Sequence, residues 1–286
     1  MRRIKLPKSV AILAALICVT AFCQAGAAAA TRHEHAAFSS GSGTFGNCDP
    51  DDLPGGSEGP DDDGDECNFT VHGLHPLPTP NGTGEFAHGS LAKALVCASA
   101  PSLYEGAEAA GRAAVVYIGL QHSPTGAAWL SHFLDGSGTS INLGDSSALA
   151  SQVKTDPAFT KLNNAVQAEI KAALDSGEQN VTLSAGVMNP PDFSGSTSNP
   201  EPHWAFGGTQ GLEVEGNGFP QNGQWKGDLT YTIRDVYGFY FSEKFHDVSA
   251  AMNYLQGVCG APDFPGGAQW FYTSVTVTVK FQQPIG

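Results

Sequence analysis

The sequence of 286 residues has few cations, few cysteines and, beyond its first 23 residues, no long apolar run. Lys and Arg number 14 against 28 Asp and Glu, which gives a formal net charge of -14. The electrostatic field of such a negatively charged chain repels phosphate backbones and anionic lipids, so nucleic-acid binding is not expected. No later stretch is long and apolar enough to span a bilayer, so we expect no stable membrane anchor once the N-terminal segment is removed.

Several compact motifs of catalysis and metal binding are also missing. The chain contains no H-E-x-x-H, no C-x-x-C and no G-x-x-x-x-G-K-[ST] segment. A zinc site built from such neighbouring ligands and a phosphate-binding P-loop are therefore not predicted. No complete catalytic constellation is recognisable, which leaves open whether the protein is an enzyme.

The N-terminus has the three-part layout of a secretory signal. MRRIKLPKS supplies cations, VAILAALICVTAF is apolar but short for a membrane span, and AGAAAA supplies small residues. We expect residues 1–30 to be a signal peptide cleaved between Ala27 and Thr31, so that the mature protein is soluble and secreted. Lipid attachment at Cys18 or Cys23 is a weaker alternative, because neither follows the usual leucine and small-residue pattern.

Four cysteines remain after the signal: Cys48, Cys67, Cys97 and Cys259. An even number in an exported chain predicts two disulfides, with three possible connectivities. We favour Cys48–Cys67, which closes an acidic loop, and Cys97–Cys259, which joins a helical segment to the C-terminal region. Each would stabilise the fold by about 2–5 kcal/mol in the chain-entropy model. Free thiols are the alternative.

Residues 31–87 are predicted to form a loop-like arm rich in Gly, Pro and Asp. Its first part has few large apolar side chains and cannot bury enough surface to offset the entropy of ordering. The run PDDDGDEC carries hard oxygen ligands of the kind that Ca²⁺ prefers; they belong to Asp61, Asp62, Asp63, Asp65 and Glu66. The spacing does not fit an EF-hand, so a solvated acidic run is favoured over a calcium site, and no other cofactor is predicted.

Residues 88–286 are predicted to form a single domain of two halves. Segments in the helical half, 88–178, are alanine-rich and place apolar residues at steps of three and four. Asp156 followed by Pro157 is typical of a helix N-cap and first turn. This half should therefore supply a layer of helices.

The period changes to two in the sheet half, 179–286. β-branched and aromatic residues alternate with polar ones, as in the run where Val275 and Val277 share one face and Thr276 the other. A helix at 247–259 interrupts these strands. We expect an α+β fold with an N-terminal helical layer packed on a twisted antiparallel sheet of about four strands with one inserted helix.

The segment GDLTYTIRDVYGF, residues 227–239, contains the candidate chemistry. Alternation places Asp235 in one row with the apolar residues Tyr231 and Ile233. A carboxyl group there would be partly desolvated, which raises its pKa. The alternative is a polar strand end that points to water.

A catalytic interpretation assigns three residues at this place. Asp235 would act as base or metal ligand, Tyr237 would position a substrate, and His246 would act as acid, with His132 or His203 assisting. The favoured alternative for His246 is a histidine in a surface loop.

The segment WLSHFLDGSG, residues 129–138, and the later D-x-Y-x-F segment resemble C-terminal regions of bacterial polymorphic toxins and related uncharacterised secreted bacterial proteins. The D-x-Y part is similar to the colicin M signature, whose members hydrolyse a lipid-linked cell-wall precursor. Asp235 and Tyr237 match that signature. Gly238 replaces its second aspartate and no arginine follows His246, so the resemblance implies an incomplete site.

Two functions are consistent with these observations. The first is an extracellular or envelope-associated binding module whose sheet presents aromatic side chains, unless those side chains form the core; the candidates are Trp204, Trp225, Tyr237, Tyr240 and Trp270. The second is a toxin-like secreted hydrolase that acts on a cell-envelope substrate at Asp235, Tyr237 and His246. The first is favoured narrowly.

Overall fold

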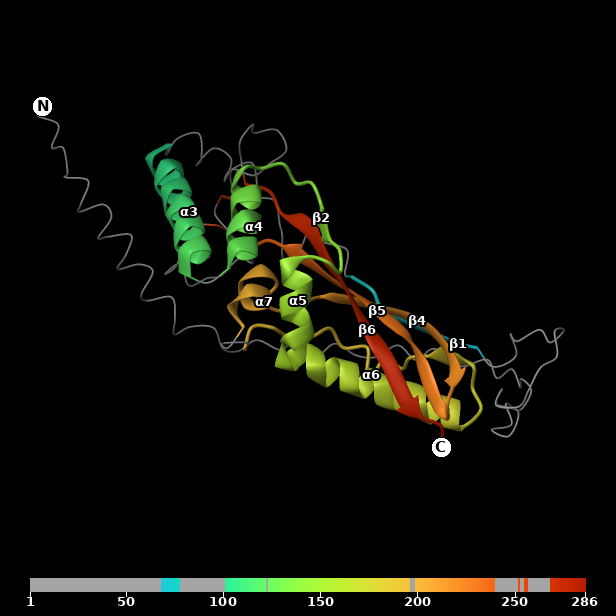
Figure 1. The fold of residues 1–286 in the computed structure, drawn as a ribbon. Coiled ribbons are helices and arrows are strands. Elements are labelled where there is room, and N and C mark those ends of the chain that lie inside the picture. Colours follow the sequence, from blue (N-terminus) through green and yellow to red (C-terminus); the bar gives the residue numbers. More distant parts are fainter. Residues whose placement is uncertain are drawn as a thin grey trace, which may run out of the picture.

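Figure 1 shows the computed structural model, which describes residues 68–77, 101–121, 123–195, 199–239, 252, 255–256 and 268–286. The strands are β1 (Phe69–His75), β2 (Ile141–Leu143), β3 (Asn180–Thr182), β4 (Gly211–Gln221), β5 (Gln224–Tyr237) and β6 (Phe271–Pro284). The helices are α3 (Pro101–Gln121), α4 (Pro124–Leu134), α5 (Ala148–Thr155), α6 (Pro157–Asp175) and α7 (Pro200–Ala205). The predicted α+β class is confirmed.

The six strands form one mixed sheet in the order β2-β6-β5-β4-β1-β3. Its centre is an antiparallel meander in which β4 and β5 form a tight hairpin through Asn222 and Gly223, whose φ angles are 55° and 70°. Two consecutive positive φ values are typical of a type I′ turn, whose twist matches that of the strands. β3 pairs parallel with β1, and β2 pairs parallel with β6.

This topology corrects the predicted sheet of about four antiparallel strands behind an N-terminal helical layer. β2 was missed because it has three residues, too few to show an alternating pattern. β3 falls within the predicted sheet half, 179–286, but it pairs in parallel. The second missed strand, β1, precedes the described helices and lies within 31–87, the segment predicted to be a loop-like arm. Its alternation is regular, with Phe69 and Val71 buried between exposed polar residues, but it stands beside a long polar run.

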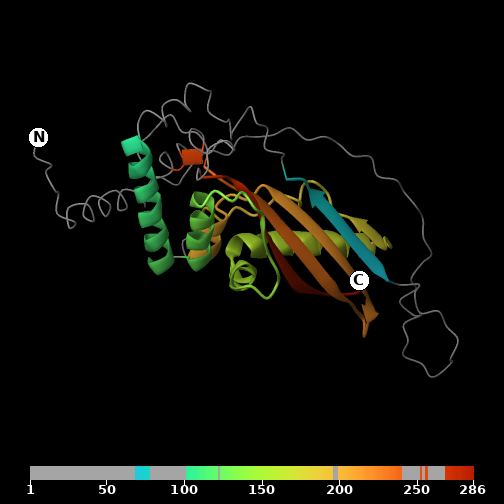
Figure 2. The same cartoon turned by 90° about the horizontal axis from the view of Figure 1, so that it is seen from above.

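The helices cover one face of the sheet. At one end α6 packs on β5, where the ring of Phe159 meets that of Tyr231 edge to face at 5.1 Å. At the other end α4 places Trp129 against Tyr237, with 5.9 Å between ring centroids. Figure 1 shows α5 and α6 beside β6, and Figure 2 shows α3 and α4 side by side at one end of the sheet.

Three of the helices begin at the polar caps that local sequence favours. Asp156 accepts a hydrogen bond from the Ala158 N–H at 2.8 Å and precedes Pro157, as predicted. Ser123 caps α4 through the Gly126 N–H at 2.8 Å, and Ser147 caps α5. These hydrogen bonds satisfy amide groups that a helix leaves unpaired at its N-terminus.

Several predictions fall on residues outside those that the structure describes. They include the signal peptide, the four cysteines, the acidic run at 61–66 and His246. Of the helix predicted at 247–259, only Met252, Leu255 and Gln256 are described, and they are helical and buried. Among the helices described, none combines the length and apolar character needed to cross a membrane.

Candidate functional site

Asp235 lies near the end of β5 on the face that the helices cover. Only 5% of its surface is exposed, and its Oδ1 atom has no hydrogen-bond partner among the described residues. Burial raises the pKa of this carboxyl group well above its usual range, and a hydrogen bond from the Val236 backbone opposes the shift only in part. The sequence-based expectation that Asp235 extends an apolar row, with a raised pKa, is confirmed.

Tyr237 follows on the same face and is enclosed by aromatic rings. It stacks on Phe271 with 5.2 Å between centroids, and Trp129, Phe133 and Phe239 meet it edge to face. Burial, and secondarily the neighbouring Asp235, raise the pKa of its hydroxyl group. The structure thus brings two of the three predicted catalytic residues together, but under α4 and within packed side chains.

His132 approaches the same place from α4. Its ring meets Phe271 edge to face at 4.5 Å, and its Nε2 atom lies 2.9 Å from both the Ser137 hydroxyl and the Thr139 carbonyl oxygen. A carbonyl oxygen only accepts, so the contact with Thr139 favours a proton on Nε2. A protonated Nε2 does not act as a base towards Ser137, and the contacts close the loop after α4 instead.

His203, the second possible assistant, lies on α7. Its Nδ1 atom is 3.3 Å from the Phe193 carbonyl oxygen, and its ring meets Trp204 edge to face. None of its described contacts is with Asp235 or Tyr237. The third catalytic candidate, His246, lies outside the described residues, so its part in this site stays a prediction.

The aromatic residues predicted to be presented by the sheet divide into two groups. Trp225 is buried against Phe69, with 5.9 Å between ring centroids, and belongs to the core. Tyr237 is half-buried and packs against that core. Trp204 and Trp270 are half-buried, and Trp270 packs edge to face on Tyr272. Tyr240 lies outside the described residues. For Trp225 the core alternative is therefore the correct one.

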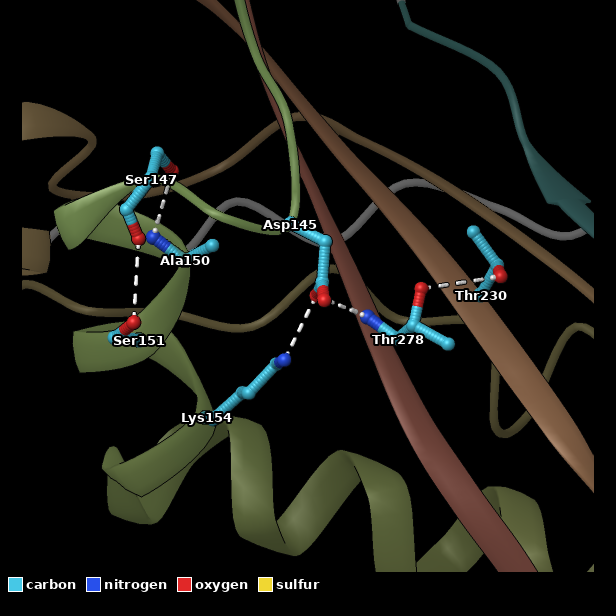
Figure 3. Close-up of polar contacts among 7 residues, drawn as sticks. All are labelled: Asp145, Ser147, Ala150, Ser151, Lys154, Thr230 and Thr278. Atoms are coloured by element: carbon cyan, nitrogen blue, oxygen red, sulfur yellow. Dashed lines mark hydrogen bonds and ion pairs between the residues drawn. The ribbon is translucent and has the colours of Figure 1, made fainter.

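The opposite face of the sheet is polar and open over much of its area. Thr230 pairs with Thr278 and Thr232 with Thr276 across β5 and β6, which places four hydroxyl groups in two adjacent rows. The first pair is in contact, with 3.4 Å between hydroxyl oxygens (Figure 3). Alternating threonines in the sequence indicate this face, although sequence analysis assigned it no function.

Carboxylates of β4 extend both rows, since Glu215 pairs in register with Thr230 and Glu213 with Thr232. Glu213 in turn forms an ion pair with Arg234. Farther along the strands, Lys280 and Asp228 form another, with 2.7 Å between Nζ and Oδ1. Arg234 and Lys280 on this face are thus paired with carboxylates, whereas Lys226 donates to the neutral Gln221 side chain at 3.0 Å.

The open face ends near Arg234. There Leu77 lies beside Gly211, because a Cβ atom added to that glycine would be 3.1 Å from the Leu77 Cα. Val236, the next residue of β5 on this face, is only 4% exposed. Solvent therefore reaches the threonine rows but not the end of the strand.

Asp145 holds the loop after β2 against β6 at the margin of this face (Figure 3). Its Oδ1 atom accepts a hydrogen bond from the Thr278 N–H at 2.7 Å and pairs with Lys154 Nζ at 2.8 Å. The Lys154 contact, followed by the Thr278 amide, holds the pKa of Asp145 below its usual value. The contact satisfies an amide on the part of β6 that β2 does not cover.

No group of three or more His, Cys, Asp or Glu side chains within the described residues is arranged to hold a metal ion. The possible calcium ligands of the acidic run lie outside those residues. No protein-family model, curated protein or solved structure matches the chain. The resemblance to polymorphic-toxin regions and to colicin M therefore stays a prediction.

Proposed function

We propose that the protein is a secreted binding module whose partner lies on the open face of the sheet. The observation that supports this is the unequal use of the two faces, since the helices cover one and the other presents the threonine rows of β5 and β6. Antiparallel sheets commonly leave one face to water, so an open face alone does not select a function. The property that favours binding is the row of hydroxyl groups on this face.

The partner that fits this surface is an uncharged component of the cell envelope that carries hydroxyl or amide groups. Threonine hydroxyls both donate and accept hydrogen bonds, and four of them stand in register across two strands. Because Arg234 and Lys280 are paired with carboxylates, they offer little net charge to a polyanion. The acidity of the whole chain, -14, also disfavours anionic polymers.

Co-sedimentation tests this proposal. The mature chain from Thr31 is mixed with insoluble bacterial cell-wall material, and the bound fraction is compared for wild type, Thr232→Lys and Ser151→Lys. Thr232 lies on the open face, whereas Ser151 is exposed on α5, so the two variants carry the same change in charge. Loss of binding in Thr232→Lys alone supports the proposal, and equal binding of all three proteins contradicts it.

A toxin-like hydrolase is the second candidate, favoured by the buried carboxyl group of Asp235 beside Tyr237. In this alternative Asp235 acts as base, Tyr237 positions the substrate and His246 acts as acid. It predicts that wild-type protein cleaves a lipid-linked cell-wall precursor and that Asp235→Asn does not. Absence of cleavage by folded wild-type protein would remove this candidate and leave the binding proposal intact.

A further inference from the structure

Binding on the open face makes no use of Asp235, which points to the other side of the sheet. A carboxyl group in a nearly water-free position is costly in its charged form and much less so in its neutral form. We propose that the protonation state of Asp235 controls the packing of α4 on β5. The neutral acid allows the C-terminal half of α4 to pack on the end of the sheet, and the ionised acid drives the two apart.

Among the described residues, nothing around Asp235 would hold it as a carboxylate. On its own strand, Tyr237 is the nearest titratable side chain on the same face, and its hydroxyl is neutral over the ordinary pH range. Across the sheet, Thr273 of β6 pairs in register with Asp235. Its hydroxyl group donates to the Asp235 backbone carbonyl oxygen at 3.4 Å and not to the carboxyl group. Arg234 points to the open face, where it pairs with Glu213.

α4, which packs on Tyr237 two residues farther along β5, supplies no counter-charge. The side chains that it places over this end of the sheet are aromatic, namely Trp129 and Phe133. Its one titratable residue here, His132, contacts Phe271 and the loop after the helix. Among the described residues, no cation therefore faces Asp235.

The two ends of α4 are held differently, which indicates the part that separates. At its N-terminus, Ser123 caps the helix and Glu201 accepts the Thr125 N–H at 2.9 Å. Near its C-terminus, the aromatic contacts with Tyr237 are joined by a backbone hydrogen bond from Gln269 to Phe133 at 3.0 Å. Ionisation of Asp235 thus acts on the half of α4 that depends most on apolar packing.

The direction of the pH effect follows from proton binding. The carboxyl group of Asp235 has a higher pKa in the folded chain than the value of about 3.9 expected in an unfolded chain. Between these two values the folded state binds more protons than the unfolded state. The contribution of Asp235 to stability is therefore fully present below the unfolded-state pKa, falls as the pH rises through this interval and becomes constant above the folded-state pKa.

Thermal unfolding between pH 4.5 and 9 tests whether ionisation of Asp235 destabilises the fold, with two isosteric variants of the mature chain. Asp235→Asn keeps the shape and removes the ionisation, while Asp228→Asn removes the same charge at an exposed site on the same strand. The melting temperature of wild type and of Asp228→Asn should fall by roughly 5 °C or more across this range. That of Asp235→Asn should fall markedly less and should exceed the wild-type value at pH 9.

Hydrogen exchange locates the effect. Exchange rates are first corrected for the pH dependence of exchange in an unprotected amide. After this correction, wild-type amides in the C-terminal half of α4 and the end of β5 should exchange roughly tenfold faster at pH 9 than at pH 5. Those of α6 should change less, and Asp235→Asn should abolish the difference between the two regions. Parallel pH profiles for all three proteins, or loosening that spares α4, would overturn the proposal.

Discussion

Gly218 and Gly227 face each other across β4 and β5, and neither position has room for a side chain. A Cβ atom at Gly227 would lie 2.2 Å from the Asn217 carbonyl oxygen, and one at Gly218 would lie 2.2 Å from that of Lys226. Both obstacles are backbone atoms, so relief requires the strands to shift. The close approach of these strands thus depends on two opposed glycines.

We therefore expect Gly227→Ala to destabilise the fold by about 1–3 kcal/mol, in the range of other overpacking substitutions. Urea denaturation followed by circular dichroism measures the change. Gly144→Ala is the control, because a Cβ atom there meets nothing within 4 Å. Similar midpoints for both variants would show that the strands accommodate the methyl group without strain.

Asp145 should stabilise the margin of the sheet mainly through the Thr278 amide. Asp145→Ala leaves that N–H without its acceptor, at a cost of about 1–2 kcal/mol. Lys154→Ala removes only a half-exposed ion pair, which is worth less than about 1 kcal/mol. Denaturant titrations should rank the variants in that order, and a larger effect for Lys154→Ala would assign the stabilisation to charge.

The pH dependence of Asp145 has the opposite sign to that of Asp235. Its folded-state pKa is lowered, so its contribution is present above the unfolded-state value of about 3.9 and disappears as the pH falls through the folded-state pKa. The difference in melting temperature between wild type and Asp145→Ala should consequently shrink in strong acid. A constant difference down to pH 2 would contradict this assignment.

The hydroxyl group of Tyr231 should contribute through one partly buried hydrogen bond. It donates to Asn163 Oδ1 at 2.9 Å and links β5 to α6. Tyr231→Phe keeps the packing against Phe159 and should cost about 0.5–1.5 kcal/mol. A double-mutant cycle with Asn163→Ala measures the coupling, and strictly additive losses would mean that the hydrogen bond adds nothing.

The predicted oxidation of the cysteines is tested by alkylation. If Cys48, Cys67, Cys97 and Cys259 form two disulfides in the exported chain, iodoacetamide should modify none of them under denaturing conditions without a reductant. After reduction all should react. Peptide mapping then separates the favoured pairs, Cys48–Cys67 and Cys97–Cys259, from the other connectivities, and labelling before reduction would show free thiols.

The part of the fold that sequence predicts best is the part with long, regular patterns. The period of two in β5 and β6 places Asp235 among apolar residues, and the Asp156-Pro157 pair marks the start of α6. β2 lacks this regularity because it is a short strand added in parallel at one edge. Its pairing depends on contacts with residues of β6 that are far away in the sequence.

The candidate site shows a similar division. Alternation correctly predicts that Asp235 is desolvated, because that depends on its own strand. It does not predict that α4 lies over Tyr237 or that Trp225 is enclosed by Phe69, because those contacts join segments far apart in the chain. Whether a strand face is covered is a tertiary property, and this determines which polar residues are available for binding.

Site-specific photocrosslinking is the most direct test of whether the partner binds on the open face, because it reports which face contacts the partner. A benzoylphenylalanine is placed at Thr232 on the open face or at Ser151 on α5, and the mature protein is irradiated with insoluble cell-wall material. We expect covalent capture from position 232 and little from position 151. Capture from position 151 with none from 232 would show that the helical side is the binding surface and would contradict the proposed function.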